Sequence, residues 1–348
     1  MGLYDELGVR RVINACGIYT DLGGSCLSPA VWDAAAEANR TWASVPELLD
    51  RAGARIAELV SAEAARVVPG ASAGIALSVA ACIARGDGAV AEALPRTDAV
   101  VLLQRAHAYK YVRCARLAGA RVVEVDSLAE ALSLEPVAIL HPAHLDDAGE
   151  PLSAVRELGV PVVVDAAYLS YPLDELARWS GADFACFSAK YFWGPNGGGF
   201  VAGRRERIAD LAALDFTGYE SGRWRTFGRA FKLDRATIAA TVVALEEWVA
   251  LDHAPRWAGY EAIARELAHV FPGALLKHFT LDERVVDGPV NAVVVPGAAG
   301  LEPAFAAGDP SVRTIADGDD LVLCTETLAA TEVDEIARVW RSVKARSG

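Results

Sequence analysis

The chain has 348 residues, with 33 Lys and Arg against 46 Asp and Glu, which gives a formal net charge of −13. Its 53% apolar and 23% charged residues are enough to build a large core, so global disorder is excluded. The acidic balance argues against nucleic acid or an anionic membrane as a partner. No apolar run reaches the roughly twenty residues that cross a bilayer, and the N-terminus lacks a signal-peptide pattern. We therefore expect a cytoplasmic protein.

Short apolar strands alternate with helices over the first two thirds of the chain. Helices are expected at 29–40, 47–60, 75–85, 109–117 and 153–158, and strands at 65–68, 99–103, 121–125, 137–140, 160–164 and 183–187. Continuously apolar strands that alternate with helices are typical of a mainly parallel sheet buried on both faces. The sequence therefore predicts an α/β fold.

The last hundred residues have a different pattern. A long amphipathic helix at 235–251 is followed by a helix near 260–270, a strand at 292–295, a hairpin of 311–315 with 321–324, and a final helix at 332–344. This pattern predicts a small α+β domain. We expect an N-terminal segment near the active site at 1–22, a large domain at 23–245 and a small C-terminal domain at 246–348.

Cysteine and lysine usage narrows the chemistry further. The six cysteines lie far apart without a C-x-x-C pair, which is neither a zinc pattern nor a disulfide framework. The chain has only five lysines, at positions 110, 190, 232, 277 and 344. A mechanism that needs a lysine therefore has few candidates.

A turn of small residues follows the strand at 65–68. Residues 70–74 read Gly-Ala-Ser-Ala-Gly and precede a helical segment. Backbone N–H groups at a helix N-terminus bind anions, and small side chains let a phosphate approach. The turn matches neither the dinucleotide nor the P-loop fingerprint. A phosphate site and a tight turn without a ligand both remain open on this pattern alone.

Two further polar residues follow predicted strands. Asp165 ends the strand at 160–164, and Lys190 lies three residues beyond the strand at 183–187. Ligands of open parallel sheets bind at the carboxyl ends of the strands. Asp165 could be a solvated residue, a metal ligand or the partner of a cationic nitrogen. Lys190 could be a surface side chain or, near apolar groups, an amine that forms a Schiff base.

The three features together fit one cofactor. Pyridoxal phosphate needs a lysine for its aldehyde, a carboxylate for its pyridine nitrogen and an anion site for its phosphate. The turn at 70–74, Asp165 and Lys190 supply these groups in chain order. The combination predicts a pyridoxal-phosphate enzyme more strongly than any of the three motifs does by itself.

The chain also resembles a known family. It is similar to the selenocysteine synthase-like branch of fold-type-I pyridoxal-phosphate enzymes, which includes D-glucosaminate-6-phosphate ammonia-lyase-like proteins. The matching stretches cover most of the chain, at 11–17, 48–53, 70–82, 118–120, 163–167, 190–195 and 228–232. The resemblance implies a mainly parallel seven-stranded sheet in the large domain, a small C-terminal α+β domain and an active site at a homodimer interface.

Roles for individual residues follow from the resemblance. It implies that Lys190 is the Schiff-base lysine, that Asp165 holds the pyridine nitrogen, and that the cofactor ring stacks on His107; a histidine packed in the core is the alternative for His107. The phosphate-binding residues would be Ala71, Ser72, Ala73 and Ser188. No metal site is implied.

The sequence departs from the family pattern near the anion sites. Ser188 is separated from Lys190 by one residue where relatives have two, and residues 197–199 are Gly-Gly-Gly where relatives have Gly-Thr-Gly. Relatives often carry an arginine near the position of Glu326. The substrate anion is assigned by resemblance to Arg229, Lys232 and Arg313, and for the first two a salt bridge at the start of a helix is the alternative.

The reaction is less defined than the cofactor. The resemblance favours a small-molecule substrate, an amino acid or amino sugar acid, that loses its Cα proton and then a β-substituent. Racemisation, transamination and aldol-type cleavage use the same cofactor, and a non-catalytic relative is a further alternative. The residues at 70–74 also satisfy G-x-S-x-G, the nucleophile elbow of α/β-hydrolases with Ser72 as nucleophile, which we rank as a distant alternative.

Overall fold

The structure is a computed structural model that describes residues 2–280 and 284–347. The chain divides into two compact units, one of Ser25–Ala250 and one formed jointly by Met1–Gly24 and Leu251–Gly348. The boundary that we expected after residue 245 falls inside helix α10 (Arg235–Ala250), and the chain divides after that helix instead. The first residues, which we expected as a separate segment, are part of the C-terminal unit.

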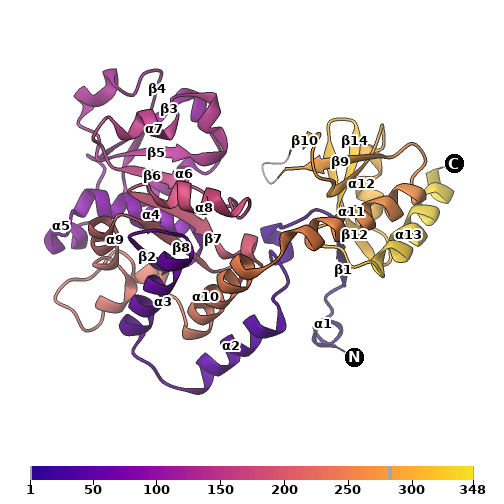
Figure 1. Ribbon diagram of the computed structural model, residues 1–348, viewed down its shortest axis with the longest axis horizontal. Coiled ribbons are helices and arrows are strands. Elements are labelled where there is room, and N and C mark those ends of the chain that lie inside the picture. The colour runs from indigo at the N-terminus through magenta and orange to yellow at the C-terminus, as the bar shows by residue number, and fades with distance from the viewer. Residues whose placement is uncertain (1, 281–283, 348) are drawn as a thin grey trace. The chain divides into compact units, whose positions relative to one another are not determined.

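The larger unit is built on a seven-stranded sheet with the order β2-β8-β7-β6-β5-β3-β4 (Figure 1). Strands β4, β3, β5, β6 and β7 are parallel, and β8 runs antiparallel to both of its neighbours. This arrangement confirms the predicted α/β fold with a mainly parallel sheet. The strands are β2 (Ala64–Val68), β3 (Val100–Gln104), β4 (Arg121–Val125), β5 (Ala138–Pro142), β6 (Val162–Asp165), β7 (Phe184–Ser188) and β8 (Gly199–Gly203).

The central strands are apolar because both of their faces are covered. Successive side chains of a strand point to opposite faces, and those of β6 do so into two separate cores. Val162 and Val164 belong to one apolar cluster, and Val163 belongs to the cluster that contains α4. Asp165 follows on the same face as Val163, so the sheet itself directs this carboxylate toward the helix α4 side.

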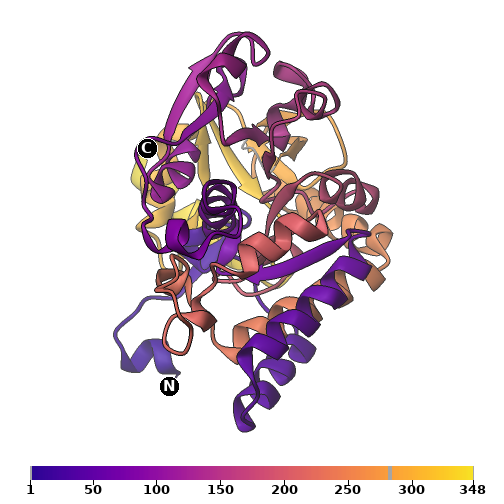
Figure 2. The same cartoon turned by 90° about the vertical axis from the view of Figure 1, so that its left-hand side faces the viewer.

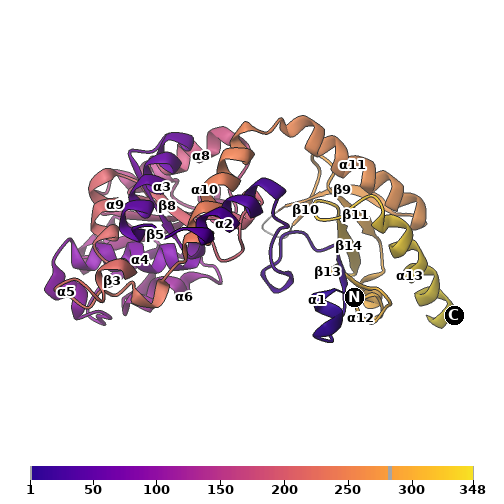
Figure 3. The ribbon, with the colours of Figure 1, turned by 90° about the horizontal axis from the view of Figure 1, so that it is seen from below.

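Helices pack on both faces of this sheet. They are α2 (Pro29–Arg40), α3 (Val45–Leu59), α4 (Gly70–Ala84), α5 (Gly88–Glu92), α6 (Val112–Ala115), α7 (Leu152–Arg156), α8 (Leu173–Ser180), α9 (Arg205–Ala212) and α10. Figures 2 and 3 show the indigo α2 alongside the orange α10. Val31 and Ala35 of α2 and Ala240 and Ala244 of α10 form the apolar seam between the two helices.

Two helices differ from their predicted bounds in ways that matter for the site. Helix α4 begins at Gly70 rather than residue 75, so the small residues form its first turn. The predicted helix at 109–117 is shorter, since only Val112–Ala115 is α-helical. The backbone of Tyr109 lies outside this helix, and its phenol is hydrogen-bonded to Asp165. This tertiary contact overrides the local helical pattern.

The smaller unit contains a five-stranded antiparallel sheet of order β10-β9-β11-β14-β13. Helices α11 and α13 pack against each other and share an apolar core with this sheet (Figure 1). The strands are β9 (Leu275–Phe279), β10 (Val285–Val286), β11 (Ala292–Val295), β13 (Ile315–Asp317) and β14 (Asp320–Cys324), and the helices are α1 (Leu3–Glu6), α11 (His253–Val270), α12 (Glu302–Ala306) and α13 (Glu332–Ser347).

A separate parallel pair joins the two ends of the chain. Strand β1 (Val12–Asn14) pairs with β12 (Ser311–Arg313) in this unit. The predicted hairpin strand at 311–315 is therefore wrong as one element: its first part pairs with β1, and only β13 forms the hairpin with β14. Thr314 is buried and lies between β12 and β13, where the chain changes from pairing with β1 to pairing with β14. Among the described residues, no helix combines the length and the apolar character needed to cross a membrane.

Candidate active site

Asp165 and Lys190 follow neighbouring parallel strands. Asp165 is the last residue of β6 and lies opposite Cys186 of β7. Lys190 lies just beyond the end of β7, in the 3-10 turn η6 (Ala189–Phe192). Because the carboxyl ends of parallel strands meet at one edge, the sheet brings the carboxylate and the amine to the same edge. This is where open α/β sheets bind ligands.

The carboxylate of Asp165 is held at both oxygens. The backbone N–H of Ala167 donates to Oδ1 at 3.1 Å, and the Tyr109 hydroxyl donates to Oδ2 at 2.9 Å. The residue is 7% exposed. Burial raises the pKa of Asp165, while the two hydrogen bonds act in the opposite direction. A cationic partner at this position would relieve the cost of burying the charge.

Lys190 is half-buried, and its surroundings favour the neutral amine. Partial burial, followed by repulsion from Lys110, lowers the pKa of Lys190. Its Nζ lies 4.9 Å from the centre of the Tyr191 ring. A neutral lysine amine is a nucleophile toward carbonyl groups. Burial and the charge of Lys110 therefore both favour the nucleophilic form of Lys190.

The first turn of α4 is suited to an anion. Gly70 has φ +83°, and Pro69 precedes the helix without capping it by a side chain. Ala71 and Ala73 are buried, and Ser72 is exposed. The first N–H groups of a helix have no intrahelical acceptors, so this turn presents donors to an anion such as phosphate.

Ser188 is the last residue of β7, two positions before Lys190. Its backbone N–H donates to the carbonyl oxygen of Ala167 at 3.0 Å, and the residue is 7% exposed. This hydrogen bond connects the end of β7 to the segment that follows β6. A phosphate contact for Ser188, with those for Ala71, Ser72 and Ala73, stays a prediction.

His107 lies in the interior. Its ring is 1% exposed and meets the ring of His141 edge to face, with 4.8 Å between the centroids. Burial lowers the pKa of His107, and the charge of Asp146 acts in the opposite direction. Stacking of the cofactor on His107 stays a prediction. The aromatic residue that touches Asp165 is Tyr109, which sequence reasoning missed because it lay inside a predicted helix.

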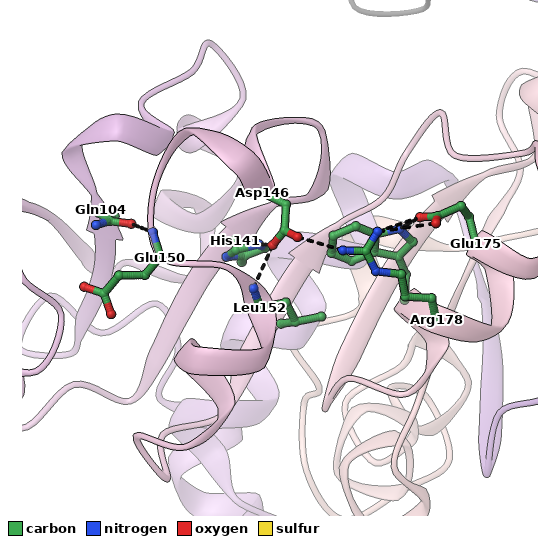
Figure 4. Close-up of polar contacts among 8 residues, drawn as sticks. Gln104, His141, Asp146, Glu150, Leu152, Glu175 and Arg178 are labelled. Atoms are coloured by element: carbon green, nitrogen blue, oxygen red, sulfur yellow. Dashed lines mark hydrogen bonds and ion pairs between the residues drawn. The ribbon is translucent and has the colours of Figure 1, made fainter.

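The loop after β5 is fixed by a polar network (Figure 4). Asp146 accepts a hydrogen bond from the backbone N–H of Leu152 at 2.7 Å and pairs with His141 and with Arg178, each at 2.8 Å. Burial lowers the pKa of His141 to about 4. Near pH 7 a neutral imidazole therefore donates the hydrogen bond to the Asp146 carboxylate. The network holds the 3-10 segment η5 (Ala143–Ala148), which carries His144 toward Tyr109.

The predicted substrate-binding residues belong to two different units of the chain. Arg229 forms an ion pair with Glu220, with Nε 2.9 Å from Oε1, in the segment before α10. Lys232 is exposed. Arg313 belongs to β12 of the smaller unit. The Glu220 pairing fits the salt-bridge alternative for Arg229, and substrate binding by these three residues stays a prediction.

The residues of the larger unit fit pyridoxal phosphate. The cofactor needs a neutral amine, a buried carboxylate and an anion site. Lys190 is an amine with a lowered pKa, Asp165 is a buried carboxylate, and the first turn of α4 offers backbone N–H groups. The three come from the carboxyl ends of β7, β6 and β2. A buried carboxylate whose pKa is raised is stabilised by the protonated pyridine nitrogen of this cofactor.

Comparisons with known proteins agree with this fit. No family model matches the chain. The chain is 31% identical over 274 residues to D-glucosaminate-6-phosphate ammonia lyase of Salmonella typhimurium, which covers 71% of this chain and 70% of that protein. It is 30% identical over 279 residues to 5'-C-glycyluridine monooxygenase-decarboxylase of a Streptomyces species, covering 73% of this chain and 67% of that one.

Solved structures show the same fold. A structure of D-glucosaminate-6-phosphate ammonia-lyase superposes with a TM-score of 0.83 at 25% identity and covers 99% of both chains. Serine palmitoyltransferase of Sphingomonas wittichii matches with a TM-score of 0.61 at 14% identity, over 97% of this chain and 88% of that one. These matches exclude the α/β-hydrolase alternative with Ser72 as the nucleophile. The chain therefore belongs to the family of fold-type-I pyridoxal-phosphate-dependent enzymes that includes D-glucosaminate-6-phosphate ammonia lyase.

Proposed function

We propose that the chain is a pyridoxal-phosphate-dependent lyase that removes the Cα proton and a β-substituent from an amino acid or amino sugar acid and releases ammonia. The observation that carries this proposal is the placement of Asp165 and Lys190 at the carboxyl ends of two neighbouring parallel strands. The similarity to an ammonia lyase supports elimination over other outcomes. The homodimer implied by the resemblance and the cytoplasmic location expected from the sequence composition belong to the same proposal.

When bound, pyridoxal phosphate supplies an electron sink that stabilises negative charge at a substrate Cα. The residues of the chain then have separate tasks. Asp165 would accept a hydrogen bond from the pyridine N–H and so stabilise the proton on that nitrogen. The first turn of α4 holds the phosphate through backbone N–H groups.

Lys190 provides the amine for covalent attachment and for proton transfer. A general base is most effective when its pKa lies near the working pH. Partial burial and the charge of Lys110 shift Lys190 in this direction. With the substrate bound, the neutral Nζ of Lys190 would be the base placed to take the proton from Cα.

His107 has a supporting task in this proposal. Its 1% exposed ring packs on His141, and His141 is hydrogen-bonded to Asp146. These contacts favour a role in holding the loop after β5 over direct contact with the cofactor. His107→Phe should therefore change the free energy of unfolding more than it changes the visible absorption of the bound cofactor.

The experiment combines cofactor loading with a substrate panel. Wild-type protein mixed with pyridoxal phosphate should turn yellow, and borohydride should fix the cofactor on the peptide that contains Lys190. Lys190→Ala should abolish both signals and the activity, while Lys277→Ala, in the smaller unit, should retain them. D- and L-amino acids and amino sugar acids are then tested for ammonia release.

The products decide between the outcomes. Ammonia with a 2-oxo acid supports the proposed elimination. An inverted Cα, an amino group transferred to a 2-oxo acid, or an aldehyde fragment would assign racemisation, transamination or aldol-type cleavage instead. Oxygen consumption with loss of CO₂ would match the activity in the name of the Streptomyces relative. A colourless Lys190-containing protein would reject the cofactor role of Lys190.

A further inference from the structure

We infer that Tyr109 is a positioning residue that acts on the cofactor through Asp165, by fixing the carboxylate and keeping it ionised. This inference rests on the proposed role of Asp165 as the partner of the pyridine nitrogen. Its central observation is the 2.9 Å hydrogen bond from the Tyr109 hydroxyl to Oδ2 of Asp165, in a site where that carboxylate is 7% exposed.

The hydrogen bonds of Asp165 leave acceptor positions open for a further donor. An ionised carboxylate has about four acceptor positions on its two oxygens. Ala167 occupies one position on Oδ1 and Tyr109 occupies one on Oδ2. With a donor on each oxygen, the carboxylate plane is fixed by the chain itself. A pyridine N–H can therefore bind to an oriented acceptor without displacing either donor.

The direction of the Tyr109–Asp165 hydrogen bond is also fixed. Burial, followed by the charge of Asp165, raises the pKa of Tyr109 far above its usual value. The phenol consequently stays protonated at any working pH and can only donate to the carboxylate. Since its hydrogen bond lowers the pKa of Asp165 against the effect of burial, the phenol favours the ionised form that a pyridine N–H requires.

Other groups near Asp165 do not compete as titrating partners. Cys186 is opposite Asp165 on β7, and Cys114 belongs to α6. Burial raises the pKa of both thiols, and the Cys186 thiol also lies within hydrogen-bonding distance of the Ser78 hydroxyl. Both thiols are therefore neutral near pH 7. The thiols therefore do not contribute to the pH dependence of cofactor binding in this range, which we assign to the Lys190 amine and to Asp165 with its hydrogen bond from Tyr109.

The ring of Tyr109 is itself held in place. It contacts His144 edge to face, with 5.6 Å between the centroids, and His144 lies 5.7 Å from Tyr168. Tyr168 in turn lies 6.3 Å from Tyr191, beside the amine of Lys190. This series of rings connects the hydrogen-bond partner of Asp165 to the proposed Schiff-base lysine. A phenol placed by such neighbours restrains the carboxylate more than a mobile side chain would.

The test compares Tyr109→Phe with Tyr111→Phe. Tyr109→Phe keeps the ring and removes only the donor, and Tyr111 is an exposed neighbour whose ring lies 6.1 Å from that of Tyr109. Affinity is measured by titrating each apo protein with pyridoxal phosphate between pH 6 and pH 9. Removing a hydrogen bond to a charged group should weaken binding about tenfold, with a larger loss at the acidic end. Tyr111→Phe should bind like the wild type.

A double-mutant cycle separates this inference from the proposed function. In an Asp165→Asn background, which cannot ionise, adding Tyr109→Phe should change neither the affinity profile nor the visible band of the bound cofactor. An equal effect of Tyr109→Phe in both backgrounds would overturn the inference, as would a wild-type profile for Tyr109→Phe alone. If Asp165→Asn itself binds like the wild type, the role of Asp165 fails and the inference fails with it.

Discussion

Gly199 packs closely against Gly70: a Cβ atom placed on Gly199 would lie 2.8 Å from the Cα of Gly70 and closer still to the carbonyl oxygen of Phe187. Gly199 is the first residue of β8, and Gly70 is the first residue of α4, with φ +83°. The contact seats the anion-binding turn against the sheet. The three glycines at 197–199, which replace a more usual Gly-Thr-Gly, thus have a packing role at their last position.

The first prediction concerns this contact. Gly199→Ala should lower the free energy of unfolding by about 2–3 kcal/mol, because the added methyl group overpacks two backbone segments. It should also weaken binding of pyridoxal phosphate by displacing the first turn of α4. Chemical denaturation and a cofactor titration measure the two effects.

Gly197→Ala is the matched control. A Cβ atom on Gly197 would meet nothing within 4 Å, so this variant should resemble the wild type in both measurements. If the two variants behaved alike, the seating of the turn by Gly199 would be refuted.

The second prediction concerns Glu326 in the smaller unit. Burial raises the pKa of Glu326 to about 7 from 4.5, although Arg256 and a 3.0 Å hydrogen bond from Asn291 oppose this shift. A carboxylate with a raised pKa binds more protons in the folded than in the unfolded protein. The free energy of unfolding should therefore fall as the pH rises from about 4.5 to about 7.

Glu326→Gln keeps the acceptor for Asn291 and removes the titration. At pH 8 this variant should be more stable than the wild type by about 1–3 kcal/mol, and at pH 4.5 the difference should shrink. Glu266→Gln, an exposed position on α11, serves as the control and should leave the pH profile unchanged. Denaturant titrations at several pH values would detect an absent or inverted trend.

The third prediction concerns the network around Asp146. Asp146→Asn removes the charge that faces Arg178 and weakens the acceptor for His141 and Leu152. We expect a loss of about 1–3 kcal/mol in the free energy of unfolding. Asp147→Asn changes the exposed neighbour in the same loop and should have an effect within about 0.5 kcal/mol. Equal stabilities for the two variants would contradict the role of the network.

The parts of the site that could be predicted are those set by the strands. Asp165 and Lys190 stand out in the sequence because each is a polar residue beyond an apolar strand, and the parallel sheet fixes where such residues meet. Tyr109 could not be predicted in the same way. Its segment has a helical pattern, and only the folded chain reveals that the phenol reaches a carboxylate 56 positions away.

The fold was predictable to a similar extent. The parallel strands have a local signature of continuous apolar residues, whereas β8 begins with a glycine run that resembles a turn. The strand at 311–315 was predicted as one arm of a hairpin because its other partner, β1, is nearly 300 residues away. Pairings over such distances leave no local signal, so register and partner exchange emerge only from tertiary structure.

The pairing of β1 with β12 also bears on the order of events during synthesis. All elements of the larger unit leave the ribosome before residue 251, so that unit can fold while translation continues. The smaller unit needs strands from both ends of the polypeptide. Strand β1 therefore stays unpaired until β12, in the final quarter of the chain, has been synthesised, which makes this unit the last to form.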